Sequence, residues 1–199
     1  MINLITKEHL AKIIRIVSVP PIMVSIFILI LVYNKNNIFR NSTEIIIMIA
    51  LLGFVPALAY VLSGLVPKIR EQGREGQRKL AFITNLAGYS IALLWAVFTN
   101  ADKGLLLICL TYFLSVVFLT ICNRGFHFRA SGHASSFTGP LILLVYFLGW
   151  KVIIPALMIA GFIIWASVYL KRHTIKELAG GILVNILAFI FSVIIITVL

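Results

Sequence analysis

His173 and Glu177 are spaced for catalysis by a histidine that a carboxylate holds in place. They lie four residues apart in the polar stretch "KRHTIKE", so on a helix they share one face and come within reach of each other. A carboxylate against an imidazole fixes its tautomer and raises its basicity, which suits a histidine that acts as a base or a nucleophile. The alternative is an incidental pair at a membrane interface, where polar side-chain ends reach toward water.

A second histidine, His133, follows two small residues that could form an anion pocket. The stretch "RASGHASS" places Ser131 and Gly132 directly before a hydrophobic run. A helix that starts there would offer free backbone N–H groups, the positive end of the helix dipole and a hydroxyl group. The alternative is an ordinary helix cap made by Ser131, with His133 as a bystander. This stretch by itself leaves both readings open.

The stretch "REQGREGQRK" contributes arginines, among them Arg74 and Arg78. Guanidinium groups suit phosphate because they bind it through two parallel hydrogen bonds and stay charged. The alternative is a solvated loop whose basic residues only anchor the chain at the membrane surface.

Two histidines, one carboxylate and several arginines are suited to phosphoryl transfer through a histidine without a metal. One imidazole would attack phosphorus and the other would protonate the leaving oxygen, while arginines and backbone N–H groups would hold the charge on the remaining oxygens. A zinc site would need three or four Cys, His or carboxylate ligands at suitable spacing, and His9 and His127 lie apart from any such pattern. We therefore expect no metal site and no other cofactor.

The composition indicates that these residues are positioned by membrane-spanning helices. The chain has 199 residues, of which 61% are hydrophobic and 12% are charged, and its mean hydropathy is +1.10. A soluble domain of this length could not bury so much apolar surface. The net charge of +11 (17 basic minus 6 acidic) would suggest nucleic acid in a soluble protein. Because the basic residues lie between hydrophobic runs, they either anchor the chain at the membrane surface or bind an anionic substrate. We expect a bilayer and a lipid phosphate as partners, and no nucleic acid.

Seven hydrophobic runs approach the length of about 20 residues that a membrane span requires. The first should kink at Pro20-Pro21, and the fifth is short and contains Pro140. The sequence therefore predicts an all-α transmembrane bundle of six or seven spans, in a single integral-membrane domain over residues 1–199. The runs are Ile13–Tyr33, Ile45–Val66, Leu80–Phe98, Leu105–Cys122, about Ala134 to Trp150, Val152–Leu170 and Leu178–Leu199.

Following the runs across the membrane gathers the polar segments on one side. With the N-terminus on side A, the segments after the second, fourth and sixth runs all emerge on side A, with three of the four histidines. Side A carries 13 of the 17 Lys and Arg residues and side B carries 4, so the positive-inside rule places side A in the cytoplasm. A phosphate site would also enrich side A in arginine, and without the three site-bearing segments the count is three against four. We expect an integral protein of the cell membrane whose active-site face is cytoplasmic.

These segments resemble the three signatures of the type 2 phosphatidic acid phosphatases, a family of membrane lipid phosphate phosphatases. "ASGHA", Ala130 to Ala134, is similar to Pro-Ser-Gly-His with alanine for proline. "ASVYLKRHTIKELAG" is similar to Ser-Arg, five residues, His, three residues, Asp, with glutamate at the last position. "REGQRK" is similar to the arginine end of Lys, six residues, Arg-Pro, with Lys79 for the proline. The resemblance covers a phosphatase-like core of about residues 66–199.

The resemblance implies a role for each matched residue. His173 would be the nucleophile that forms a phosphohistidine, oriented by Glu177. His133 would be the general acid and then the base that activates water. The phosphate would be bound by Arg78, Ser131 and Gly132, and the family is typically metal-independent.

The chain departs from the family's pattern at two charged positions. Ser167 stands where the third signature has a phosphate-binding arginine, and Glu71 stands where the first has its lysine. Losing one such contact can slow a phosphoryl transfer by on the order of a hundredfold. The basic residues that could replace the missing arginine are Arg74, Arg129, Lys171 and Arg172.

The leading hypothesis is a membrane phosphatase that acts on a lipid phosphate or diphosphate, such as phosphatidic acid, a prenyl diphosphate or the polyprenyl carrier of cell-wall synthesis. The alternative, which Ser167 favours, is a catalytically weakened relative that binds or moves an anionic lipid. A small transporter would be expected to carry ionisable residues within its spans, and the interiors of the runs contain essentially none.

Overall fold

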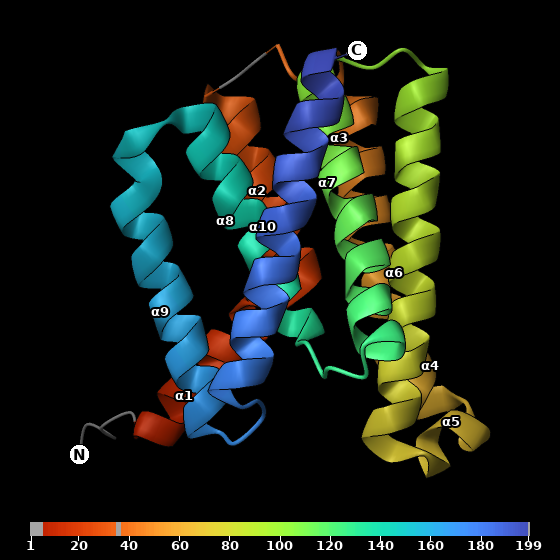
Figure 1. Ribbon diagram of the computed structural model, residues 1–199, viewed down its shortest axis with the longest axis vertical. Coiled ribbons are helices and arrows are strands. Elements are labelled where there is room, and N and C mark those ends of the chain that lie inside the picture. Colours follow the sequence, from red (N-terminus) through yellow and green to blue (C-terminus); the bar gives the residue numbers. More distant parts are fainter. Residues whose placement is uncertain (1–5, 35–36, 199) are drawn as a thin grey trace.

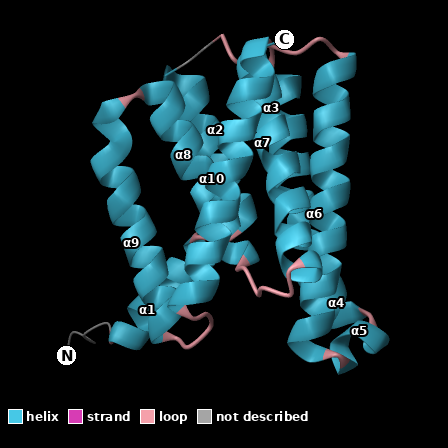
Figure 2. Ribbon diagram, in the orientation of Figure 1, coloured by secondary structure: helices cyan, strands magenta, loops and turns pink. Residues whose placement is uncertain are grey.

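The computed structural model describes residues 6–34 and 37–198, and in this part of the chain all regular structure is helical (Figures 1 and 2). The expected all-α transmembrane bundle is therefore confirmed. The helices are α1 (Lys7–Val17), α2 (Pro20–Asn34), α3 (Ser42–Ile49), α4 (Val55–Leu65), α5 (Pro67–Glu71), α6 (Gly73–Phe98), α7 (Lys103–Thr120), α8 (Gly132–Leu148), α9 (Ile153–Tyr169) and α10 (Ile175–Val198). Short π-helical segments, η1 (Ala50–Phe54) and η2 (Ile121–Gly125), join α3 to α4 and extend α7, and a 3₁₀ turn, η3 (Trp150–Val152), precedes α9.

Five continuous helical segments are long and apolar enough to cross a membrane: Ser42–Leu65, Gly73–Phe98, Lys103–Gly125, Trp150–Tyr169 and Ile175–Val198. The pair α1 and α2 adds a sixth if the bent pair is one span. The remaining hydrophobic run forms α8, which has 17 residues and so extends about 25 Å. This is less than the roughly 30 Å of a bilayer core, which agrees with the expectation that the fifth run is short.

The first hydrophobic run is broken rather than continuous. Its two helices, α1 and α2, meet at an angle of 65°, and Ser18 ends α1 just before Pro20 and Pro21 open α2. Proline has no N–H to donate and its ring disfavours helical backbone in the residue before it, so the kink expected at this pair is confirmed. As a result α1 turns away from the axis of α2 and packs against α9.

The buried core is built around α7 and α10. Along α7, nine residues from Leu105 to Leu119 are buried, and α7 packs against both α6 and α10. Leu31 of α2 and Met48 of α3 belong to the same cluster of buried residues. These contacts, together with those between α8 and α10, fix how far α6, α7, α8 and α10 are displaced along one another. This displacement determines where their polar ends meet.

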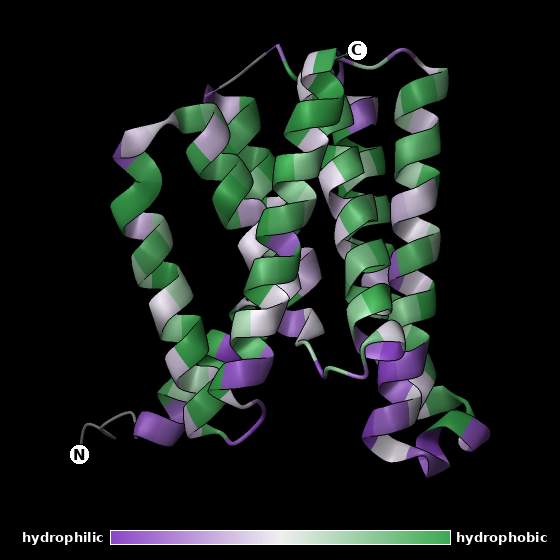
Figure 3. Ribbon diagram, viewed as in Figure 1, coloured by the Kyte–Doolittle hydropathy of each residue, from purple (hydrophilic) through white to green (hydrophobic). Residues whose placement is uncertain are grey.

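The polar ends gather at one end of the bundle, which we call the α1 end. Figure 3 shows hydrophilic residues concentrated around α1, α5, the start of α6 and the turn between α9 and α10, while the middle of the bundle is hydrophobic. The start of α1 and the end of α10 lie at opposite ends of the bundle (Figure 1). The segments that follow the second, fourth and sixth hydrophobic runs lie at the α1 end, as their order along the chain predicts.

Candidate active site

A cavity of about 220 Å³ opens at the α1 end. Nine of the ten candidate site residues line it, and the exception is Lys171. Lys171 is exposed and has a left-handed backbone (φ 51°) in the turn after α9, so it is not brought into the site. The nine are Arg74, Arg78, Arg129, Ser131, Gly132, His133, Arg172, His173 and Glu177.

His173 and Glu177 are in contact, as their spacing predicts. The Nδ1 atom of His173 lies 3.2 Å from Oε2 of Glu177, which leaves Nε2 of His173 as the ring nitrogen available to a substrate. The same carboxylate oxygen accepts a hydrogen bond from the backbone N–H of Thr174 at 3.1 Å, and Thr174 Oγ1 accepts one from the Glu177 N–H at 3.2 Å. This reciprocal pair is a capping box at the start of α10, so Glu177 is held rigidly by the helix that it caps.

Arg129 completes the environment of this carboxylate. Its Nε atom lies 3.4 Å from Oε1 of Glu177, and its own side chain is 67% exposed. Each carboxylate oxygen therefore has its own partner, a histidine on one side and an arginine on the other.

His133 lies parallel to His173. The two ring centroids are 6.5 Å apart and the ring planes differ by 7°. Nε2 of His133 lies 3.2 Å from the hydroxyl of Ser18, which itself donates to the backbone carbonyl of Arg15 at 3.2 Å. Phe137 packs edge-on against the His133 ring at 5.9 Å, so the orientation of this ring is fixed by α1 and by its own helix.

Ser131 is the N-cap of α8, so the cap reading of this stretch is correct for its hydroxyl. Ser131 Oγ accepts a hydrogen bond from the N–H of Ala134 at 3.2 Å, and the Ser131 N–H donates to the backbone carbonyl of Glu177 at 2.8 Å. By contrast, no described residue accepts a hydrogen bond from the backbone N–H of Gly132 or His133. These two groups are the free donors of the first turn, and Gly132 is exposed. The Ser131 hydroxyl is therefore used by the helix cap, and of the groups expected in an anion pocket the two backbone N–H groups that follow it remain available.

The first turn of α8 is seated directly on α10 because of a glycine. A Cβ atom at Gly181 would lie 2.2 Å from the backbone oxygen of Ser131 and 2.8 Å from Cβ of Ala134. Only a residue without a side chain permits this approach. The packing brings the N-terminus of α8 beside the turn that carries His173.

Arg78 is held by a residue that the sequence motifs do not include. Its Nη2 atom donates to Oδ1 of Asn123 at 3.2 Å, and the amide nitrogen of Asn123 donates to the carbonyls of Leu119 at 2.8 Å and Ala130 at 3.3 Å. Asn123 lies in η2, so the π-helical end of α7 positions the arginine and ties it to the segment before His133.

The N-terminal helix contributes Arg15 and Ser18, which sequence reasoning did not assign to the site. Arg15 lines the cavity, and its Nη1 donates to Oγ of Ser167 at 3.2 Å. Tyr60 of α4 lines it as well. The cavity thus extends beyond the phosphatase-like core expected at about residues 66–199. The Pro20-Pro21 pair predicts a bend before α2, but no sequence signal gives the direction that brings Arg15 and Ser18 to the site.

Burial lowers the pKa of His173 below its ordinary value, and the positive charges of Arg15 and Arg78 lower it further, while the contact with Glu177 opposes the shift. The net effect keeps the imidazole neutral at neutral pH, which is the form that can attack an electrophile.

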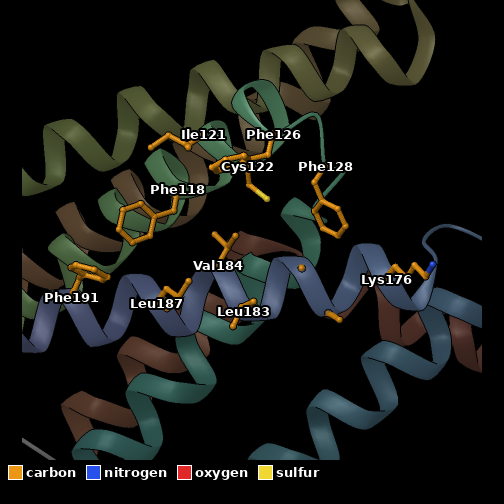
Figure 4. A pocket seen from close by; sticks show the side chains of 12 residues that line it. Phe118, Ile121, Cys122, Phe126, Phe128, Lys176, Leu183, Val184, Leu187 and Phe191 are labelled. Atoms are coloured by element: carbon orange, nitrogen blue, oxygen red, sulfur yellow. The ribbon is translucent and has the colours of Figure 1, made fainter.

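An apolar groove of about 700 Å³ runs beside the cavity along α10. Figure 4 shows Phe118, Cys122 and Phe128 on one side of it and Leu183, Leu187 and Phe191 of α10 on the other. Lys176 and Phe191, which mark its two ends on α10, are 15 residues apart, so the groove extends about 22 Å along the helix.

The groove lies next to the cavity, because at two places consecutive residues of the chain line one and then the other. Lys176 lines the groove and Glu177 the cavity, and Phe128 lines the groove and Arg129 the cavity. Leu183 and Phe191 are about half exposed, so the groove is open on the outer surface of the bundle.

Among residues 6–34 and 37–198, no three His, Cys, Asp or Glu side chains are grouped so as to hold a metal ion. Neither His9 nor His127 lines the cavity. What the cavity does contain is an excess of positive charge. Its lining has five arginines against one carboxylate, Glu177; the arginines are Arg15, Arg74, Arg78, Arg129 and Arg172.

Comparison of the chain with protein-family models, with curated proteins and with solved structures gave no match. The resemblance to the phosphatases therefore rests on the three sequence motifs alone.

Proposed function

We propose that this protein is a metal-independent membrane phosphatase that removes phosphate from a lipid phosphate or diphosphate through a phosphohistidine. One observation carries the proposal. The rings of His133 and His173 are parallel with their centroids 6.5 Å apart, and the nucleophile candidate His173 is held through Nδ1 by Glu177 at 3.2 Å. Two imidazoles at this separation can act on opposite bonds of one phosphoryl group.

In the first step, Nε2 of His173 attacks phosphorus and the bond from phosphorus to the lipid oxygen breaks. His133 gives its proton to that oxygen, so the lipid leaves as an alcohol, or as a monophosphate if the substrate is a diphosphate. In the second step, His133 takes a proton from water, the water oxygen attacks phosphorus, and the bond from phosphorus to Nε2 breaks. Inorganic phosphate leaves and both histidines return to their starting states.

The positive lining of the cavity supports an anionic substrate. Five arginines and one carboxylate line it, and Arg78 is fixed by Asn123. Fixed guanidinium groups and the free N–H groups of Gly132 and His133 would hold the charge that builds up on the phosphoryl oxygens. No acidic side chain among the described residues forms an ion pair with His133, so the charge that keeps a proton on this ring would come from the substrate phosphate itself.

The apolar groove supports a lipid as the carrier of the phosphate. It begins beside the cavity at Lys176 and Phe128 and is lined almost wholly by hydrocarbon. A hydrocarbon chain lying in the groove would place its phosphorylated end at the arginines. Phosphatidic acid, prenyl diphosphates and polyprenyl carriers all have this form.

We place the enzyme in the cell membrane with the α1 end toward the cytoplasm, on the strength of the 13 basic residues assigned to that side. Labelling of Lys171→Cys in intact cells tests this placement, since Lys171 is exposed and lies outside the cavity. An impermeant maleimide should leave it unlabelled until the cells are opened.

The activity is tested with protein purified in detergent with EDTA, by measuring phosphate release from dioleoyl phosphatidic acid, farnesyl diphosphate and undecaprenyl diphosphate. The wild type should release phosphate from at least one of them, and His173→Gln should abolish release. His9→Gln is the matched control, because His9 is exposed and lies outside the cavity. Binding of all three lipids without turnover would favour a lipid-binding protein instead.

A further inference from the structure

Arg15 lies in an unusual environment for an arginine near a membrane surface. It belongs to α1, its side chain is partly buried, and its Nη1 donates to the fully buried hydroxyl of Ser167 at 3.2 Å. Within residues 6–34 and 37–198 it forms no ion pair with a carboxylate. An arginine that serves only to anchor a helix extends toward water, whereas this one is turned inward.

The charges around Arg15 are mainly of its own sign. Arg172 and Arg74 act on it electrostatically, and all three line the same cavity as His133 and His173. Partly burying a cation among other cations is unfavourable unless an anion joins them. The arrangement is therefore incomplete without a negatively charged ligand between these guanidinium groups.

The position of Ser167 explains why α1 is the source of this charge. Ser167 lies on α9 and is fully buried, and it stands where the resemblance to the phosphatases implies an arginine. A serine leaves room at this point, and the 65° break at Pro20 turns α1 so that Arg15 comes to it from another helix.

We infer that Arg15 is a phosphate-binding residue of this site, and that it supplies from α1 the guanidinium that residue 167 lacks. Its fork would hold oxygens of the transferring phosphoryl group in the cavity that Arg78 and the two histidines also line. This inference rests on the proposed function, and it makes α1 part of the active site.

The inference is tested by moving the arginine between the two helices. Four variants are assayed for phosphate release, and their folding is checked by the midpoint of thermal unfolding. They are Arg15→Gln, Arg15→Ser, Ser167→Arg and the double variant Arg15→Ser/Ser167→Arg. Lys12→Gln is the control, since Lys12 is an exposed cation on the same helix that pairs with Glu8.

Arg15→Gln and Arg15→Ser should lower kcat/KM by on the order of a hundredfold, as expected for one charge-assisted contact in a transition state, while Lys12→Gln stays close to the wild type. Ser167→Arg alone adds a like charge where Arg15 already lies, so it should not raise activity. The double variant should recover at least about tenfold over Arg15→Ser, because the guanidinium returns from α9. A folded Arg15→Gln within about threefold of an active wild type would overturn the inference, whatever the double variant does.

Orthovanadate binding by the wild type and Arg15→Gln separates this inference from the proposed function. If no lipid phosphate is hydrolysed but vanadate binds the wild type and binds Arg15→Gln at least tenfold more weakly, the activity is wrong and the anion site at Arg15 stands. If vanadate binds both equally, or binds neither, Arg15 is not part of an anion site.

Discussion

The backbone N–H of Ser131 donates a 2.8 Å hydrogen bond to the backbone carbonyl of Glu177. This bond joins the turn before His133 to the first turn of α10, which follows His173. The separation of the two histidines is therefore set by backbone contact between α8 and α10, and side-chain flexibility contributes little to it. Changes at this contact should affect catalysis more than they affect phosphate affinity.

Gly181→Ala tests the contact directly. The added methyl group would meet the backbone oxygen of Ser131 at 2.2 Å, so α8 and α10 must separate. We expect a loss of about 1–3 kcal/mol in unfolding free energy, the usual range for overpacking, and a fall in kcat of at least tenfold. The measurements are the thermal midpoint and phosphate release.

Gly161→Ala is the matched control for this variant, because no atom lies within 4 Å of the corresponding Cβ position on α9. It should leave both quantities near the wild type. Equal effects of the two substitutions would mean that the Ser131 contact does not determine the site geometry.

Glu177 both contacts His173 and caps α10, and different substitutions separate these two roles. Glu177→Gln can still accept the hydrogen bond from the Thr174 N–H and so preserve the helix cap, but it loses the charge that supports His173. We expect kcat to fall by roughly 10²–10⁴-fold, the span attributed to assisted histidine catalysis, with little change in stability. Glu177→Ala should also lose about 1 kcal/mol of stability with the cap, which a denaturation curve measures. A Gln variant that keeps full activity would remove Glu177 from the mechanism.

The pH profile should show the lowered pKa of His173. The neutral imidazole is the nucleophile, so activity should be retained as the pH falls past the ordinary histidine pKa of about 6.5. Activity should be lost only when the pH falls through the lowered pKa of His173. Arg78→Gln removes a positive charge that lowers this pKa, and should move the acid limb of kcat/KM to higher pH. Glu177→Gln removes the group that raises it, and should move the limb to lower pH.

Comparing the limb among these variants removes the ionisation of the substrate, which is common to all of them. If the acid limb of kcat/KM lies at the wild-type pH in both variants, the group that titrates is not His173.

Leu183→Trp tests whether the groove holds the lipid chain. Leu183 lines the groove and is 57% exposed, so the indole should occupy part of the groove without disturbing the core. We expect KM for a long-chain lipid phosphate to rise by about tenfold or more, while a water-soluble short-chain phosphate is hydrolysed as before. Leu94→Trp is the control, with similar exposure on α6 and no contact with the groove. Equal effects on long and short substrates would show that the chain lies elsewhere.

The spans could be predicted from the sequence because the thickness of a bilayer fixes how many apolar residues a span needs. Gathering of His133, His173 and Arg78 at one end follows from counting these spans, and the contact between His173 and Glu177 follows from helical spacing. The capping box formed by Thr174 and Glu177 also matches the sequence pattern of "TIKE".

The contributions of Arg15, Ser18 and Asn123 could not be predicted. Arg15 reaches Ser167 across 152 positions of sequence, and only the angle between α1 and α2 brings it there. A proline pair predicts that a helix bends, but not the direction of the bend. Asn123 reaches Arg78 because α7 ends in a π-helical turn, and hydropathy carries no signal for such a turn.

Trapping of a phosphoprotein tests whether His173 forms a phosphohistidine. Protein is mixed with ³²P-labelled lipid phosphate in a single turnover and quenched in alkali, where a phosphorus–nitrogen bond survives, and the label is then challenged with acid. We expect an acid-labile label on the wild type and none on His173→Gln. With a substrate whose leaving group needs no proton, more label should accumulate on His133→Gln, because hydrolysis of the intermediate is slowed. Turnover by the wild type together with an undiminished label on His173→Gln would exclude His173 as the nucleophile.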